Sequence, residues 1–120
     1  MVDLCWVSQQ TKRWSIELAV EMEWNPHSND VVYDFSKLVN LKSPRKIMLC
    51  APYPSHRSDT IARIIDLVRS AKYRSPEEKY GIVYFVYTKD DRELIHDKIE
   101  SRAYFLNYKG EVPYEMYWTR

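Results

Sequence analysis

Glycine and cysteine are scarce in this chain of 120 residues, which contains only two of each. Two glycines cannot build the glycine-rich loops that cradle nucleotide phosphates, so nucleotide-dependent activity is not expected. Two cysteines are too few for a disulfide framework or a structural zinc site. Because Cys5 and Cys50 both lie in apolar runs, we expect buried, reduced thiols in a cytoplasmic protein.

The chain also lacks an excess of either charge and any long apolar run. Its 18 Lys and Arg residues against 17 Asp and Glu residues leave a formal net charge of +1. A nucleic-acid-binding surface would therefore have to be local rather than a property of the whole chain. No apolar stretch approaches the roughly 18 residues that a membrane helix requires, so a membrane partner is not expected.

The most regular pattern in the sequence is an alternation of apolar and polar residues over residues 14–24. The even positions from Trp14 to Trp24 are all apolar, whereas the odd positions carry Ser, Glu and Ala. A period of two predicts a half-buried β-strand. A shorter alternating run over residues 2–7 precedes it, separated by a polar break. The two runs are expected to form an antiparallel hairpin.

Two helices and two inner strands are expected after this hairpin. One apolar stripe of helical spacing precedes Pro44, which ends the helix, and a second stripe follows the Pro-rich loop of residues 52–57. Asn29 or Asp30 is the expected N-cap of the first helix, and Ser58 or Asp59 that of the second. Apolar runs at residues 47–51 and 82–87 read as strands, and the helix between them predicts a parallel pair.

Residues 90–99 are compatible with a short helix, and residues 103–108 and 112–118 with a terminal hairpin around Lys109 and Gly110. The expected fold class is therefore α/β, with a mixed sheet in the order β-β-α-β-α-β and a tail. One domain is expected to span residues 1–120.

Three carboxylates in the expected hairpin are the strongest candidates for chemistry. Glu21 and Glu23 project from the same side of their strand, about 7 Å apart. If the hairpin turns around Lys12, Asp3 lies opposite Glu21, and the three carboxylates form a site suited to Mg²⁺ or Mn²⁺. If it turns around Gln10, Asp3 pairs with Glu17 instead and the cluster loosens. A solvated strand face is the alternative to both.

Three segments carry a resemblance to a known superfamily: residues 2–6 (VDLCW), 19–25 (AVEMEWN) and 34–38 (DFSKL). Together they resemble the core of the PD-(D/E)XK phosphodiesterases, the superfamily of restriction endonucleases and DNA-repair nucleases. The resemblance is close over residues 2–51 and extends to residue 87 in element order alone. It implies a restriction-endonuclease-like core that lacks the family's first helix.

The same resemblance implies metal-dependent hydrolysis of nucleic-acid phosphodiester bonds. Asp3 and Glu21 would be metal-binding acids, with Mg²⁺ or Mn²⁺ as the cofactor. Glu23 stands where the family usually has a catalytic lysine, and would act as a third ligand or a base. Lys37, on the following helix, could supply the missing positive charge, as in members that place their lysine there.

The substrate implied is nucleic acid, with DNA as the expected form. His56, Arg57 and Arg63 are the candidates for contacting its phosphates. The departure at Glu23 and the missing helix keep a second hypothesis open: a catalytically inactive protein with the nuclease fold that binds nucleic acid or another protein. A homodimer is also compatible with an incomplete core sheet.

Overall fold

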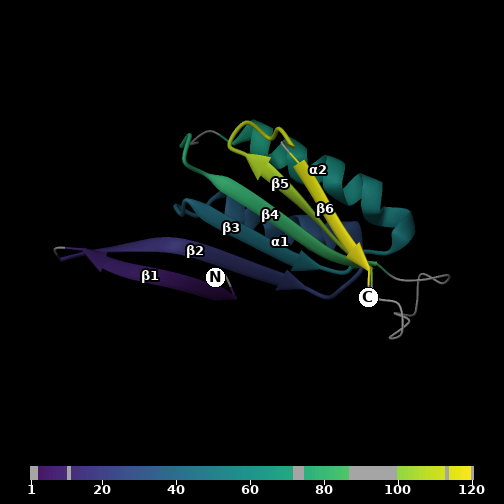
Figure 1. The fold of residues 1–120 in the computed structure, drawn as a ribbon, viewed down its shortest axis with the longest axis horizontal. Helices are drawn as coiled ribbons and strands as arrows, with labels where there is room; N and C mark the ends of the chain where they lie inside the picture. The colour runs from purple at the N-terminus through teal and green to yellow at the C-terminus, as the bar shows by residue number, and fades with distance from the viewer. Residues whose placement is uncertain (1–2, 11, 72–74, 87–99, 113, 120) are drawn as a thin grey trace.

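The computed structural model describes residues 3–10, 12–71, 75–86, 100–112 and 114–119 (Figure 1). Its elements, in chain order, are β1 (Leu4–Gln10), β2 (Arg13–Glu23), α1 (Ser28–Val39), β3 (Arg45–Cys50), a 3-10 turn (Pro54–His56), α2 (Arg57–Ser70), β4 (Lys79–Val86), β5 (Glu100–Asn107) and β6 (Tyr114–Thr119). The expected short helix at residues 90–99 lies outside the described residues.

Within the described residues, six strands form one mixed sheet whose spatial order is the same as their order in the chain. β1 pairs antiparallel with β2, the strands β2, β3 and β4 are mutually parallel, and β5 and β6 continue the sheet antiparallel. The predicted N-terminal hairpin, inner parallel pair and C-terminal hairpin are thus all confirmed. The protein is a mixed α/β structure.

Both helices cover the same side of this sheet, as Figure 1 shows. The predicted apolar stripes face it: Phe35 and Leu38 of α1 and Ile64 of α2 have no exposed surface. They pack with Met48 and Ile82 from the middle strands in one core cluster. Burial of such side chains contributes roughly 1.5–3 kcal/mol each, so this layer between helices and sheet is a major source of stability.

A β-bulge interrupts the alternation of β2. Trp6 faces Leu18 while Val7 faces Ile16, so Glu17 is an extra residue with no counterpart on β1. The bulge turns Ile16 to the helix side, where it packs against the core. The expectation of one continuous apolar face from Trp14 to Trp24 is therefore wrong, because residues before and after the bulge alternate out of phase.

The N-termini of the helices also differ from the sequence expectations. α1 begins at Ser28 and α2 at Arg57, and neither has a side-chain N-cap in the described residues. Asn29, Asp30, Ser58 and Asp59 are thus not N-caps, because each helix has already begun before them.

The two cysteines have different environments. Cys50 is buried as expected, and burial raises the pKa of its thiol to about 12. Cys5 is exposed instead, because it lies on β1, the edge strand of the sheet (Figure 1). None of the described helices has the length and apolarity that a membrane span needs.

Candidate metal centre

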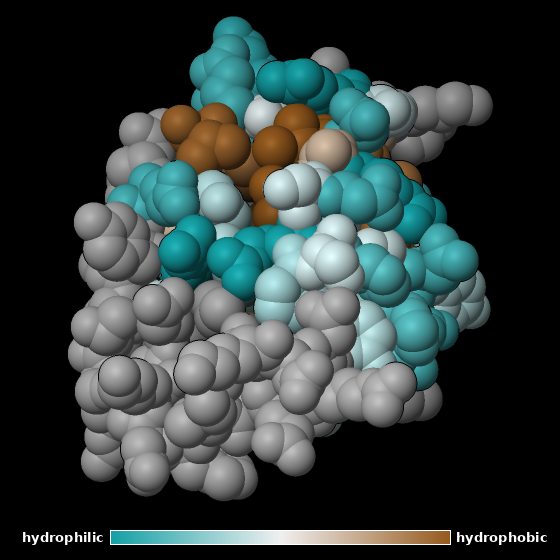
Figure 2. All heavy atoms as spheres, turned by 90° about the vertical axis from the view of Figure 1, so that its right-hand side faces the viewer, coloured by the Kyte–Doolittle hydropathy of each residue, from teal (hydrophilic) through white to brown (hydrophobic). Residues whose placement is uncertain are grey.

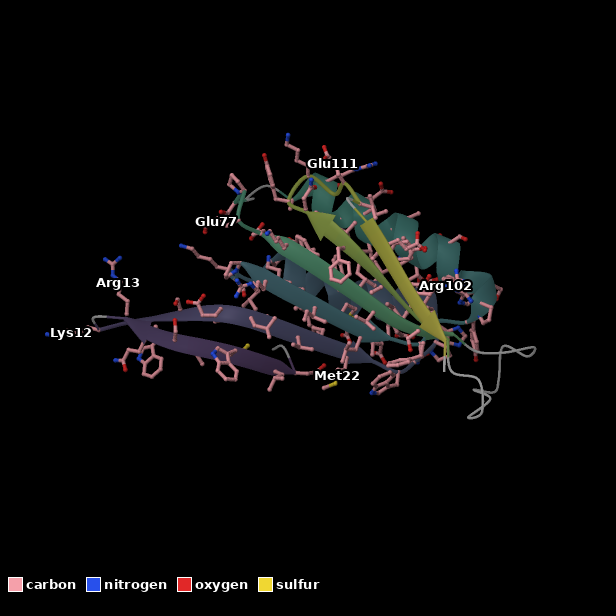
Figure 3. The ribbon with its side chains drawn as sticks, in the orientation of Figure 1. Lys12, Arg13, Met22, Glu77, Arg102 and Glu111 are labelled. Atoms are coloured by element: carbon pink, nitrogen blue, oxygen red, sulfur yellow. The ribbon has the colours of Figure 1, made fainter. Side chains whose placement is uncertain are left out.

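The pairing of β1 with β2 decides between the two hairpin registers left open by the sequence. Leu4 faces Val20, so Asp3, one residue earlier, lies opposite Glu21. The Asp3 carboxylate accepts a hydrogen bond from the backbone N–H of Met22 at 2.7 Å, which fixes it at this end of the hairpin. Figure 3 shows Met22 at that end and Lys12 at the far end, in the turn. The register that gathers the carboxylates is the one formed.

Glu21 is not part of a solvated strand face. It points toward the helix layer and is only 1% exposed, and its Oε1 has no hydrogen-bond partner in the described part of the chain. Burial, followed by the negative charge of Asp3, raises the pKa of Glu21 to about 7. A buried carboxylate with an unpaired oxygen is unfavourable unless a proton or a cation compensates it.

Glu23, two residues further along β2, is partly buried on the same side of the strand. Its Oε1 accepts a hydrogen bond of 2.7 Å from the backbone N–H of Asn25. Burial and the neighbouring carboxylates Asp34 and Asp30 raise its pKa, although the Asn25 N–H opposes the shift. Glu23 therefore joins Glu21 in a strongly acidic environment.

Lys37 extends from α1 toward this group of carboxylates. Its Nζ forms an ion pair of 2.8 Å with Asp34, one helical turn away. The hydrogen bond to Asp34 is the main reason why the Lys37 pKa is raised, and the charge of Glu21 contributes. Asp3 and Lys37 thus both act on Glu21, whereas Glu23 is linked to this group through Asp34.

Asp34 is the residue of this site that the sequence reasoning missed. It interacts electrostatically with both glutamates of β2. Its signal was the spacing to Lys37, because residues three apart on a helix share a face.

The donor set suits a hard divalent cation, since every candidate ligand is a carboxylate oxygen. In the described residues, however, no group of three or more His, Cys, Asp or Glu side chains is close enough to hold a metal ion. Asp3, Glu21 and Glu23 therefore do not form a three-carboxylate site, but Asp3 and Glu21 interact directly through their side chains. Those two carboxylates are the residues that could hold a metal, with water or phosphate oxygens completing its coordination.

The predicted phosphate-contacting residues lie just before α2 and in its N-terminal half. His56 and Arg63 line a pocket of about 540 Å³ between the N-termini of α1 and α2. Arg63 donates a hydrogen bond of 2.9 Å to the Asn29 side chain and pairs with Asp59 at 3.6 Å. Arg57 places its guanidinium 5.5 Å from the centre of the Tyr84 ring. The two arginines therefore have internal partners and do not form a free basic patch.

Three aromatic rings beside that pocket were not anticipated. His27, Tyr53 and His56 contact one another with ring centroids 5.2–5.7 Å apart. Two loops bring them together, because Tyr53 donates its backbone N–H to the carbonyl of Pro26. Such rings can stack on nucleic-acid bases. Widely separated histidines in sequence gave no sign of this cluster.

This end of the molecule is the one toward which β2, β3 and β4 run in Figure 1. Figure 2 views it directly and shows hydrophilic side chains around an apolar cluster in the described part of the surface. Asp30 connects the two groups of residues here, since it lines the pocket and also influences Glu23. The carboxylates and the ring cluster thus belong to one region.

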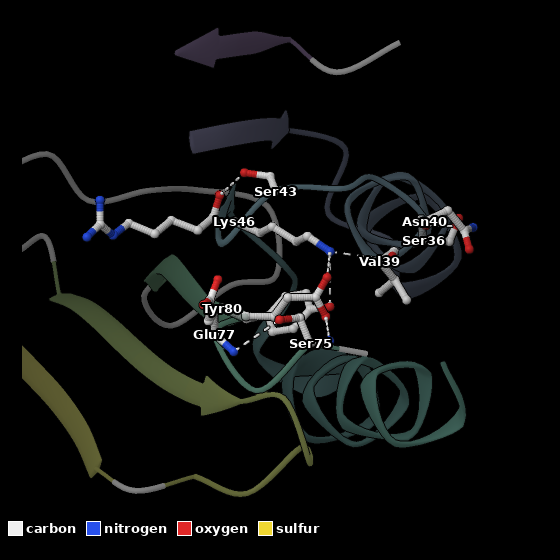
Figure 4. Close-up of polar contacts among 10 residues, drawn as sticks. Ser36, Val39, Asn40, Ser43, Lys46, Ser75, Glu77 and Tyr80 are labelled. Atoms are coloured by element: carbon white, nitrogen blue, oxygen red, sulfur yellow. Dashed lines mark hydrogen bonds and ion pairs between the residues drawn. The ribbon is translucent and has the colours of Figure 1, made fainter. Parts of the chain in front are cut away.

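A second buried polar group lies at the opposite end of the parallel strands (Figure 4). The Lys46 side chain has no exposed surface and pairs with Glu78 at 3.1 Å. Its ammonium also donates to the carbonyl of Val39, in the last turn of α1, and to the Tyr80 hydroxyl. Lys46 thereby ties a helix end to two strands, which is a structural role.

The resemblance to the PD-(D/E)XK phosphodiesterases expected from residues 2–6, 19–25 and 34–38 stays a prediction. Comparison of the whole chain with family models, curated proteins and solved structures gave no match of any kind.

Proposed function

We propose that this chain is a metal-dependent nuclease with a restriction-endonuclease-like core. The observation that carries the proposal is Glu21, a buried carboxylate with an unpaired oxygen directly beside the carboxylate of Asp3. Two carboxylates in this arrangement repel each other, and a divalent cation between them would remove the repulsion. The charge of Lys37 acts on Glu21, and Glu23 lies two residues further along β2.

In the proposed mechanism, Asp3 and Glu21 supply the protein ligands of Mg²⁺ or Mn²⁺. The bound ion would lower the pKa of a water molecule and offset charge on the phosphate. Glu23 would accept a proton from the attacking water, which its raised pKa favours. Lys37 would face the phosphate group once a cation balances the acidic side chains that now surround it.

Nucleic acid, with DNA as the preferred form, is the substrate that we propose. The ring cluster of His27, Tyr53 and His56 would stack on a base next to the scissile phosphate. Arg57 and Arg63 would contribute positive charge at the edge of the same region. Because the net charge of the whole chain is only +1, the positive charge available to nucleic acid is confined to this region.

The test is calorimetric titration of Mn²⁺ into the protein and into Glu21→Gln. The wild type is expected to show saturable binding that Glu21→Gln abolishes. Glu17→Gln is the matched control, because Glu17 is on the same strand but hydrogen-bonds to Ser8 and Ser15 instead of facing the helices. Cleavage of DNA and RNA with Mn²⁺ should then be lost in Glu21→Gln and kept in Glu17→Gln. Absence of Mn²⁺ binding by the wild type would refute the catalytic proposal.

A catalytically inactive module that binds nucleic acid or a protein is the second candidate. The ion pair between Lys37 and Asp34 favours this candidate, since it engages the ammonium group that a nuclease would direct at the phosphate. The module would bind single- or double-stranded DNA without Mn²⁺, and Arg57→Ala would weaken that binding. Binding that persists in Glu21→Gln, with no cleavage by the wild type, would favour this candidate over the nuclease.

A further inference from the structure

The first strand is an open edge of the sheet. β1 is the terminal strand in the sheet order, and within the described residues it pairs on one side only, with β2. Its sequence, LCWVSQQ, contains neither a charged residue nor a proline. Those are two of the features that normally prevent an edge strand from pairing with another chain, and the extra residue of the β-bulge lies on β2 rather than on β1. Nothing in the strand itself blocks a further strand from adding to it.

The side chains of this edge are unusually apolar for a surface. Trp6 is 70% exposed, Leu4 59% and Val7 48%. The tryptophan alone presents roughly 105–175 Å² of surface, given its 70% exposure. Covering these residues would be favourable, since each Å² of apolar surface removed from water contributes about 25 cal/mol.

We infer that β1 pairs antiparallel with β1 of a second copy of this chain, which joins the two sheets edge to edge. β1 runs from Leu4 to Gln10, so Val7 is its midpoint. A two-fold axis at Val7 leaves every residue of the strand paired: Val7 faces its own counterpart, Trp6 faces Ser8, and Leu4 faces Gln10. Such isologous pairing is the commonest way in which identical chains associate.

The charges of the hairpin favour a second copy in this orientation. Lys12 and Arg13 lie at the far end of the hairpin (Figure 3), just beyond the end of β1. Asp3 immediately precedes the start of β1. Antiparallel pairing brings Asp3 of each copy next to the basic turn of the other. With a net charge of +1 on each copy, long-range repulsion between them is small.

The test is the mass in solution of the full chain, measured by light scattering coupled to size exclusion. The wild type is expected at twice the 14.5 kDa of the chain. Val7→Lys and Val7→Glu should each run at the mass of one chain, because each places two like charges directly opposite one another. An equimolar mixture of the two variants should regain the doubled mass, since the charges then attract.

Tyr33→Lys is the matched control, because Tyr33 is 68% exposed but lies on α1, away from the edge. It should keep the doubled mass. The inference is overturned if the wild type has the mass of one chain at every concentration, or if Val7→Lys leaves the doubled mass unchanged. It is also overturned if the mixture does not reassociate while both variants retain the circular dichroism of the wild type.

Discussion

The ionisation of Glu21 is expected to affect the stability of this fold. Its pKa is about 7 in the folded chain and near 4.5 in the unfolded one, so between these values the folded state binds more protons. Stability should therefore fall as the pH rises from about 4.5 to 7, with the full penalty above 7. A variant without this carboxylate should not show this loss of stability as the pH rises.

The corresponding variant is Glu21→Gln, studied by urea unfolding at pH 5 and pH 8 in the presence of a chelator. The free energy of unfolding of the variant minus that of wild type should be roughly 2–3 kcal/mol larger at pH 8 than at pH 5, so the variant gains relative stability as the pH rises. Glu17→Gln should show no such gain, because hydrogen bonds from Ser8 and Ser15 lower the pKa of Glu17. If the free energy of unfolding of Glu21→Gln changed with pH just as that of wild type does, folding would not raise the pKa of Glu21.

The buried pair of Lys46 and Glu78 offers a second test at the scale of single residues. Burial lowers the Lys46 pKa, while Glu78 opposes that shift. Glu78→Ala leaves the ammonium without its counter-charge and should destabilise the protein by about 3 kcal/mol. The double variant Lys46→Met, Glu78→Leu should cost clearly less in urea unfolding, because it leaves no unpaired charge. Equal losses in the single and double variants would contradict this account.

Glu21 and Lys46 show which single residues the sequence pattern can identify and which it cannot. Glu21 and Glu23 were identified because alternate positions of a strand share a face. Lys46 was missed, because a lysine next to an apolar run is ordinarily a surface residue. It is buried here only because a carboxylate from a distant part of the chain, 32 residues on, meets it.

At the scale of the element, alternation showed that β2 has two unlike faces but could not say which one the helices cover. The apolar face is ordinarily the buried one. In this sheet the helices cover the side of Ala19 and Glu21, while Met22 and Trp24 on the other side are 39% and 53% exposed. The bulge at Glu17 was also hidden, since apolar residues occupy the even positions on both sides of it.

The turn between β5 and β6 gives a prediction for a whole element. Gly110 has a φ of 75°, and an added Cβ would lie 2.7 Å from the Arg69 side chain and 3.2 Å from the Ile65 carbonyl of α2. Gly110→Ala should therefore destabilise the protein by about 1–2 kcal/mol, measured as a lower urea midpoint. The close approach of this turn to α2 holds the C-terminal hairpin to the helix layer.

Gly81 supplies the control for that substitution. An added Cβ on β4 would meet Ile47 and Phe105 at 3.8 Å, an ordinary contact distance. Gly81→Ala should leave the midpoint unchanged or raise it, since alanine restricts the unfolded chain more than glycine does. If Gly81→Ala lowered the urea midpoint as much as Gly110→Ala does, the positive φ of Gly110 and its approach to α2 would not explain the effect.

At the scale of the whole molecule, the sequence predicted the order of elements far better than their arrangement. The two hairpins were recognisable because each joins neighbouring runs by a short connection, and the parallel pair because a helix separates its two apolar runs. That β2 pairs with β3 and β4 with β5 was not predicted, because such pairing is chosen by contacts between remote segments. The ring cluster near the candidate metal centre escaped for the same reason.

The agreement between strand order in space and strand order in the chain has a consequence for how the protein is made. No strand must insert between two that are already paired, because each new strand adds to the edge formed by the one before it. As the chain leaves the ribosome, the sheet can grow one strand at a time from β1 to β6. Until the next strand emerges, each intermediate exposes a fresh edge, and synthesis itself supplies the segment that closes it.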